Sequence, residues 1–265
     1  MPWAVEHIRR MRGGAQPHLM RCADEAYYVV KFLNNPQHQR VLANEWVATK
    51  LASLIGLPVA DAEIVEVPAP LVEQSGDLVI QLVRSRTKCV AGRQFGSRYP
   101  GDPAETVVYD FLPEEQLIEV ANLRDFLGML VFDKWTCNTN GRQVIFYRPA
   151  GQSRFQALMI DQGFCFNAGE WAFPDAPLRG LYARARVYES VTGIASFDPW
   201  LERLDSRITQ RALDDVAEHT PPEWYNFDHD ALYQLLERLW QRRRRVRDLV
   251  TAAKDTYRQP FPNWK

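Results

Sequence analysis

The chain has 265 residues and a mass of 30.6 kDa, a length that suits one large domain or two lobes around a shared cleft. Hydrophobic residues make up 46% of the sequence and aromatic residues 12%, which is enough for a substantial core and excludes disorder over most of the length. The formal net charge of −1 provides no overall field that would attract nucleic acid or an acidic membrane.

The four cysteines, Cys22, Cys89, Cys137 and Cys165, form no CxxC pair and have no zinc-type spacing with histidine. We therefore expect free, mostly buried thiols, as in a reducing cytoplasm. The N-terminal sequence MPWAVEHIRRMRGG lacks the apolar run of a secretory signal, and no stretch approaches the roughly 20 apolar residues of a membrane span. These features predict a cytoplasmic protein without membrane attachment.

The first third of the chain has the pattern of a small sheet with one long helix. Two strand-like runs, His18–Ala23 and Ala26–Leu33, surround the turn-prone pair Asp24-Glu25 and predict a hairpin. Apolar residues then recur at helical spacing over Gln37–Ile55. Alternation returns over Ala62–Val67, which predicts another strand.

The next segment, Val79–Gly101, contains five basic residues and no acidic one. Its glycines and Pro100 predict a mobile loop. The following sequence TVVYDFL, Thr106–Leu112, predicts a strand that runs into a connector closed by Pro113.

The rest of the chain is predicted to be mainly helical. Leu123–Cys137 is a strongly apolar helix candidate, and two strands are expected after it, over Gln143–Tyr147 and Phe155–Ile160. Amphipathic helices follow Pro199, the last over about Ala231–Lys254.

Lys31 in YYVVKF is the first residue suited to chemistry, because an ammonium presented from a strand can hold a phosphate in a cleft. A helix follows it, and Glu45 in NEWVA lies there amid apolar neighbours. A carboxylate at that position can pair with Lys31, and kinases need such an ion pair to position ATP phosphates. The alternatives are a solvent-facing strand lysine and a solvated helix glutamate.

A glycine-containing turn, GGAQP, lies upstream of Lys31 between two strand candidates. Small residues let backbone N–H groups approach phosphate oxygens, so Gly13, Gly14 and Gln16 are candidates for a loop that covers the phosphates. The turn is not a Walker motif, since no GK[ST] follows. An ordinary β-turn is the alternative.

Asp161 ends the apolar run ALMI and precedes Gln162-Gly163-Phe164. A carboxylate that leaves a buried strand just before a glycine can project into a cleft. Magnesium takes one or two such carboxylates and fills its other positions with phosphate oxygens and water. A turn-capping aspartate is the alternative.

The sequence FDKWTCNTNGRQVIF, residues 132–146, lies between the apolar helix and the strand that leads to Asp161. Asp133 and Asn140 are the candidates for orienting an acceptor hydroxyl. Asp133 and Asn138 are five residues apart, the Asp-to-Asn interval of HRDxxxxN. Asp133 also suits a helix-packing or capping carboxylate.

Together the motifs GGAQPHLM, YYVVKF, NEWVA, VYDFLP, FDKWTCNTNGRQ and MIDQGF resemble those of the HipA-like kinases, a bacterial branch of the protein-kinase-like fold. The resemblance covers roughly residues 10–170 and rests on motif order more than on any single string. It implies an α+β, two-lobed fold, with a small β-rich lobe and one long helix over residues 1–109 and a mainly helical lobe over residues 110–265.

The resemblance also implies ATP and Mg²⁺ binding and phosphoryl transfer, with a Ser or Thr of a protein as the expected acceptor. By this likeness Lys31 contacts phosphates, Glu45 supports Lys31, and Asp161 binds Mg²⁺. Tyr109, Asp110 and Leu112 then belong to a hinge against adenine.

One departure from the family pattern concerns the base. HipA-like kinases typically read NTDRHxxN here, and this chain has Asn140 in place of the Asp and Ile145 in place of the final Asn. An amide does not accept a proton as a carboxylate does. The sequence therefore leaves two functions open: an active kinase, and a pseudokinase that binds nucleotide and recruits a partner.

Nucleic-acid binding through basic segments is a third reading. The segments are the loop Arg84–Arg98 and the run Arg242–Arg245. The arginine run covers four successive helix directions, so a solvated face is expected and nucleic acid is not an expected partner.

Overall fold

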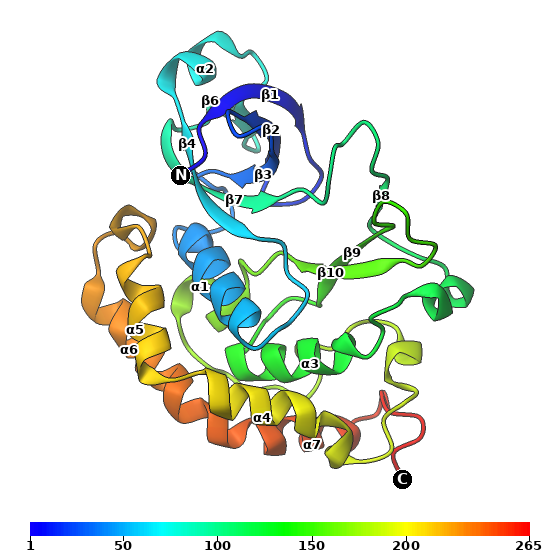
Figure 1. Ribbon diagram of the computed structural model, residues 1–265. Coiled ribbons are helices and arrows are strands. Elements are labelled where there is room, and N and C mark those ends of the chain that lie inside the picture. Colours follow the sequence, from blue (N-terminus) through cyan, green and yellow to red (C-terminus); the bar gives the residue numbers. More distant parts are fainter.

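The computed structural model describes all residues, from Met1 to Lys265, and Figure 1 shows a strand-rich part and a larger, mainly helical part. The predicted hairpin is confirmed: β2 (His18–Cys22) pairs antiparallel with β3 (Tyr27–Lys31). β1 (Ala4–Arg10) lies on the other side of β2, and two register shifts bend it.

The predicted loop over residues 79–101 is wrong for its second half, which forms the strand β7 (Gly92–Arg98). β7 lies between β3 and β4 (Ala62–Val67), so the sheet order is β1-β2-β3-β7-β4. The glycines that suggested a loop allow close packing instead: a Cβ atom at Gly96 would lie 2.4 Å from Cγ2 of Val65.

The first half of the same segment forms a separate hairpin of β5 (Val79–Gln81) and β6 (Arg86–Lys88). The short helix α2 (Ala69–Gln74) precedes this hairpin. Val72 of α2, Ile80 of β5 and Leu78, just before β5, pack with residues of the first sheet in a small core.

A second sheet has the order β10-β9-β8. β9 (Gln143–Tyr147) and β10 (Gln156–Ile160) confirm the two predicted strands, while the strand predicted over 106–112 is only β8 (Val108–Tyr109). β8 pairs with β9 rather than with the first sheet. The division into lobes after residue 109 stays a prediction.

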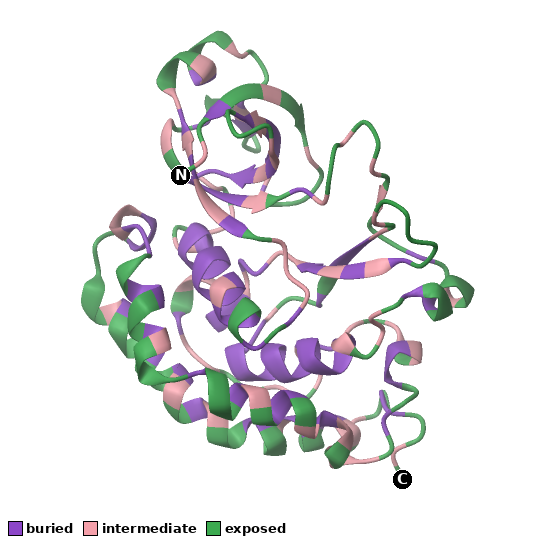
Figure 2. Cartoon of the chain, viewed as in Figure 1, coloured by how far each residue is buried: buried purple, intermediate pink, exposed green.

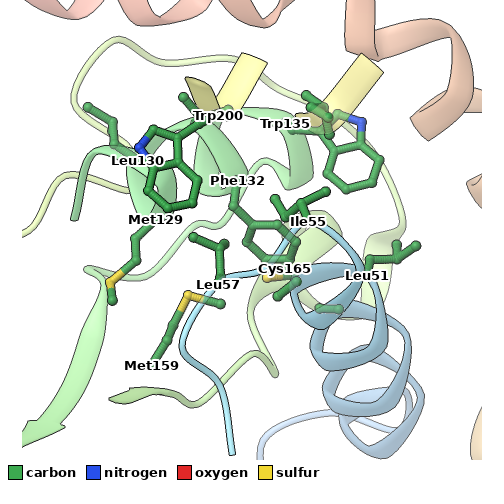
Figure 3. Close-up of a cluster of buried hydrophobic side chains, with 14 of the residues drawn as sticks. Leu51, Ile55, Leu57, Met129, Leu130, Phe132, Trp135, Met159, Cys165 and Trp200 are labelled. Carbon is green, nitrogen blue, oxygen red and sulfur yellow. The ribbon is translucent and has the colours of Figure 1, made fainter. Parts of the chain in front are cut away.

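Two helices are buried around almost their whole circumference: α1 (Val41–Leu54) and α3 (Asp125–Thr136). Figure 2 shows both as nearly continuous buried ribbon, in contrast to the C-terminal helices. The helix expected over Gln37–Ile55 is confirmed, but it begins at Val41 and ends at Leu54. A helix that is buried on nearly all sides has to lie inside a core. Figure 3 shows Leu51 and Ile55 from the end of α1 in the same cluster as Phe132 and Trp135 of α3.

Amphipathic helices cover this core from outside: α4 (Asp198–Arg207), α5 (Gln210–Glu218), α6 (His229–Arg242) and α7 (Val246–Lys254). The single helix predicted over residues 231–254 is therefore wrong, because a 3₁₀ turn at Arg243–Arg245 interrupts it. Other 3₁₀ turns lie at Glu114–Glu119, Cys165–Glu170, Ala185–Tyr188, Ile194–Phe197 and Pro222–Tyr225.

The arginine run is a solvated face only in part. Arg242 is 5% exposed, pairs with Asp175 and donates to the backbone oxygens of Lys134 and Trp135. All four cysteines are free and buried, as expected. None of the helices has the length and apolarity that a membrane crossing requires.

Candidate active site

Three charged side chains from three different elements meet in one buried cluster. Lys31 is the last residue of β3, Glu45 lies on α1, and Asp161 follows β10. The Nζ atom of Lys31 lies 2.7 Å from Oδ1 of Asp161 and also contacts Oε1 of Glu45. The chain therefore brings together residues that are 130 positions apart in the sequence.

Glu45 connects the cluster to the segment after β10. Its side chain is almost fully buried, and its Oε2 atom accepts a hydrogen bond of 3.0 Å from the backbone N–H of Gln162. Gly163 packs so closely on α1 that a Cβ there would lie 2.8 Å from Val41. These contacts attach the segment after β10 to α1 and so hold Asp161 beside Lys31.

The ion cluster shifts the pKa values of its members in different directions. Burial opposes the charge of Lys31, but Glu45 and Asp161 outweigh it and raise its pKa. Burial raises the pKa of Glu45, an effect that Lys31 only partly offsets. Burial acts the same way on Asp161, but Lys31 outweighs it and lowers the pKa to about 2. Asp161 is therefore ionised at every physiological pH.

The backbone at Asp161 is also unusual. Its φ is 58°, in the left-handed region that non-glycine residues seldom adopt. Such a conformation persists only where surrounding contacts hold it, and it occurs preferentially at functional sites. Here the contacts are those of Lys31 and of the Gln162 backbone.

The cluster forms one wall of a cavity of about 430 Å³ between the two sheets. Gly13 and Gly14 line the cavity together with Arg9, Arg10 and Arg12, which all come from β1 and the turn after it. Its apolar lining includes Val29, Phe95, Ile145, Leu158 and Met159. The cavity thus combines apolar walls with a cationic, glycine-containing side.

Six of the residues singled out in the sequence line this cavity: Gly13, Gly14, Lys31, Glu45, Asp110 and Asp161. The other six do not: Gln16, Tyr109, Leu112, Asp133, Asn138 and Asn140. Each residue of the second group has a contact elsewhere or an exposed position that explains its placement.

Gln16 anchors the turn instead of facing the cavity. Its Nε2 donates to the backbone oxygen of Gln81 at 2.7 Å, and its Oε1 accepts from the Gln81 N–H and from Arg10. The glycine turn is thereby attached to β5.

The segment predicted as a hinge lies partly off the cavity. Tyr109 is half-exposed and stacks edge-on against Phe155, while Leu112 is buried. The end of β7 and the residues that follow it line the cavity instead, namely Arg98, Tyr99 and Pro100. The sequence predicts a loop over these residues, so the connection from β7 to the cavity was not expected.

Asp133 is part of a second buried ion pair. It is fully buried, and its carboxylate accepts two hydrogen bonds from Arg142 and one from Asn138. The Asp133 carboxylate outweighs the burial of Arg142 and raises its pKa. Arg142 also donates to the Ile160 oxygen at 3.0 Å, so the pair connects α3 to the strand before Asp161. Asp133 thus lies off the cavity lining, in the helix-packing position that the sequence left open as the alternative.

Asn138 and Asn140 shape the turn after α3. The Asn140 N–H donates to Oδ1 of Asn138 at 3.1 Å, and the Asn140 side chain accepts from the N–H of Gly141. Asn138 is buried, whereas Asn140 is exposed.

Two residues that sequence reasoning did not single out make direct contacts in this region. Gln143 donates to Oδ2 of Asp161 at 2.8 Å. Asn44, next to Glu45, donates to the backbone oxygens of Gly163, Cys165 and Ala168. A second polar residue beside Glu45, within a mostly apolar stretch, is the signal that could have identified Asn44.

The arrangement is that of a kinase-like fold. A strand lysine pairs with a helix glutamate, a glycine-containing turn lines the same cavity, and an aspartate follows the last strand. The sequence agrees with this class: it matches the HipA-like kinase family over residues 4–167. This protein therefore belongs to the HipA-like kinases. None of the curated protein sequences matches the chain.

Solved structures resemble the fold over nearly its whole length. CtkA, a proinflammatory kinase of Helicobacter pylori, has a TM-score of 0.56 at 15% identity, with 92% of this chain and 96% of that chain covered. Hydra Fam20 has a TM-score of 0.51 at 11% identity, with coverage of 96% and 86%. HipA of Shewanella oneidensis, solved with HipB and operator DNA, has a TM-score of 0.50 at 14% identity, with coverage of 95% and 68%. Identities this low show a shared fold alone.

Proposed function

We propose that this protein is an ATP- and Mg²⁺-dependent phosphotransferase that transfers the γ-phosphate to a hydroxyl group, with a protein Ser or Thr as the expected acceptor. The observation that carries the proposal is the convergence of Lys31, Glu45 and Asp161 at the wall of the cavity. Nucleic acid is not an expected substrate.

The cavity fits a nucleotide in size and chemistry. Its volume of about 430 Å³ lies in the range of small-molecule sites. Val29, Leu158 and Ile145 offer apolar surface to a base, and the arginines beside Gly13 offer positive charge to phosphates. Gly13 has a φ of 121° and nothing within 4 Å of a Cβ position, so its backbone is open to an approaching phosphate oxygen.

In this proposal Lys31 holds a phosphate oxygen while Glu45 keeps the ammonium in place. Asp161 is the residue that would hold Mg²⁺, because its carboxylate is ionised and lies at the cavity wall. When bound, Mg²⁺ neutralises charge on the transferred phosphoryl group. Phosphoryl transfer depends mainly on such positioning and electrostatics.

A specific observation favours a second function, an ATP-binding pseudokinase. Asp133 is committed to Arg142, and the exposed turn residue Asn140 carries an amide rather than a carboxylate. A missing general base lowers rates by about 10²- to 10⁴-fold. The chain would then bind nucleotide and act through a partner.

The experiment that tests the proposal measures phosphate transfer from γ-labelled ATP by wild type, Lys31→Met and Asp161→Ala. We expect transfer by wild type and its loss in both variants, while Lys254→Met, a lysine outside the cavity, retains wild-type activity. Equal transfer by wild type and Asp161→Ala would overturn the phosphotransferase proposal.

Two further measurements separate the two functions. ATP binding by calorimetry without transfer in wild type supports the pseudokinase. If so, Asn140→Asp restores a carboxylate at the turn, and the appearance of transfer in that variant would identify the missing base. No ATP binding at all would remove both functions.

A further inference from the structure

Gln143 owes its position next to Asp161 to the register of the second sheet. It is the first residue of β9 and pairs with Ile160, the residue that immediately precedes Asp161. Because side chains alternate along a strand, Gln143 and Ile145 lie on the same face, and both line the cavity.

The contact between the two side chains is direct. Nε2 of Gln143 lies 2.8 Å from Oδ2 of Asp161, whereas Lys31 occupies the other carboxylate oxygen, Oδ1. The Gln143 side chain is exposed and has no other hydrogen-bond partner in the structure. Rotation of its amide therefore breaks only this one hydrogen bond.

The other amide at the cavity is already committed. Gln162 is buried, and its Oε1 accepts a hydrogen bond of 2.9 Å from Arg142. Ile145 is apolar and cannot act as a ligand. Gln143 is thus the one amide side chain lining the cavity whose oxygen, Oε1, accepts no hydrogen bond.

We propose that Gln143 provides the amide-oxygen ligand for the divalent cation that Asp161 holds, an inference that rests on the proposed nucleotide-binding function. Hard cations such as Mg²⁺ prefer oxygen ligands, and an amide oxygen is one of them. Rotation of the Gln143 amide by half a turn exchanges its Nε2 for its Oε1 beside Asp161 and turns a hydrogen-bond donor into a ligand. Gln143 would then supply the amide ligand that Ile145, which stands where the family pattern has Asn, cannot supply.

A merely structural role is the competing explanation, in which Gln143 only donates a hydrogen bond that orients Asp161. The two explanations differ for Gln143→Glu. A carboxylate loses the donor and repels Asp161 without metal, but it is itself a ligand for a hard cation. Retained metal dependence in this variant therefore separates a ligand from an orienting donor.

The test is calorimetric titration of ATP in excess Mg²⁺ and again in EDTA, with the ratio of the two affinities as the readout. We expect Gln143→Ala to reduce this ratio by about 10- to 100-fold, the range for weakened metal contacts. Gln143→Glu should keep it near the wild-type value. Gln156→Ala, a glutamine of the same hairpin that does not line the cavity, should leave it unchanged.

The outcomes separate the inference from the function on which it rests. A wild-type ratio well above one, with the same ratio in Gln143→Ala, would overturn the ligand role and leave the nucleotide site intact. A reduced ratio in both Gln143 variants would assign Gln143 to orientation alone. Failure of wild type to bind ATP in either condition would remove the proposed function itself.

Discussion

Two buried groups of charged side chains meet the segment around Asp161, and only one of them lines the cavity. The outer group, at the cavity wall, consists of Lys31, Glu45 and Asp161. The inner pair, off the cavity lining, consists of Asp133 and Arg142. A buried charge that loses its partner is strongly destabilising. Loss of either member of the inner pair is therefore expected to lower the free energy of unfolding.

The first prediction concerns this inner pair. Asp133→Asn should lower the free energy of unfolding by about 3–5 kcal/mol, because the guanidinium of Arg142 stays buried without its carboxylate. Urea unfolding measures the loss. The double variant Asp133→Leu/Arg142→Met should recover much of it, and the exposed Asp214→Asn should have no effect.

A pair of histidines on β1 and β2 predicts a pH effect on stability. Nδ1 of His18 lies 3.0 Å from Nε2 of His7. Burial, with His7 and Arg10 nearby, lowers the pKa of His18 to about 4, and burial also lowers that of His7. The unfolded chain binds these protons near pH 6.5, so the folded chain binds fewer protons between pH 6.5 and about 4.

The stability that this histidine pair contributes should therefore be present in full above pH 6.5 and be lost as the pH drops towards about 4. The measurement is the midpoint of thermal unfolding across this pH range. His18→Gln should flatten the dependence, whereas His219→Gln, an exposed histidine on another element, should not. An identical slope in wild type and His18→Gln would contradict the prediction.

At the scale of elements, α1 is the connection between the two parts of the site. It carries Glu45 into the ion cluster and, one residue earlier, Asn44 into the segment after Asp161. Asn44 also accepts a hydrogen bond of 2.7 Å from the indole N–H of Trp171. One turn of a buried helix thus positions both sides of the cleft.

The loop before Gly180 is held against α3 in a similar way. Gly180 has a φ of 76°, and a Cβ there would lie 2.3 Å from Cβ of Asp133. Gly151 has the same φ but nothing within 4 Å of its Cβ position. The two glycines therefore separate the effect of backbone conformation from that of contact.

The prediction is that Gly180→Ala destabilises the protein by about 1–3 kcal/mol more than Gly151→Ala, because only the first adds overpacking to the conformational strain. Denaturant unfolding of the two variants provides the comparison. Equal losses would show that the loop moves away from Asp133 at little energetic cost.

At the scale of the whole molecule, the two hydrophobic clusters do not divide at the cleft. The larger cluster contains α1 together with α3 and the C-terminal helices, while the smaller one lies within the first sheet and its α2–β6 extension. α1 is therefore packed as part of the larger body (Figure 1), and the first sheet rests on it. The cavity is lined by the first sheet, at Val29 and Lys31, and by the larger body, at Glu45 and Met159.

This arrangement predicts that ATP with Mg²⁺ stabilises the whole fold. At a ligand concentration about 100 times the dissociation constant, the gain is about 2.7 kcal/mol. Thermal unfolding with and without nucleotide should show a raised midpoint in wild type and a smaller shift in Lys31→Met. A shift of the same size in Lys31→Met would place the nucleotide elsewhere.

The sequence predicted the elements whose signals are local. The hairpin before Lys31, the strands β9 and β10 and the buried helix α3 all have period-2 or period-3.6 patterns within a few residues. β7 has no such pattern. It lies between β3 and β4 and packs closely on Val65 at Gly96. Local patterns carry no information about such contacts.

The sequence by itself singled out Lys31, Glu45 and Asp161 as candidates, because each charged residue lies within or just after an apolar run. Only the tertiary structure distinguished Asp161 from Asp133, which also lies in an apolar run. The difference is a long-range one: Asp133 meets Arg142 in the interior, whereas Asp161 meets Lys31 at the cavity wall. The same is true of Gln143, whose position depends on a strand register that no local pattern records.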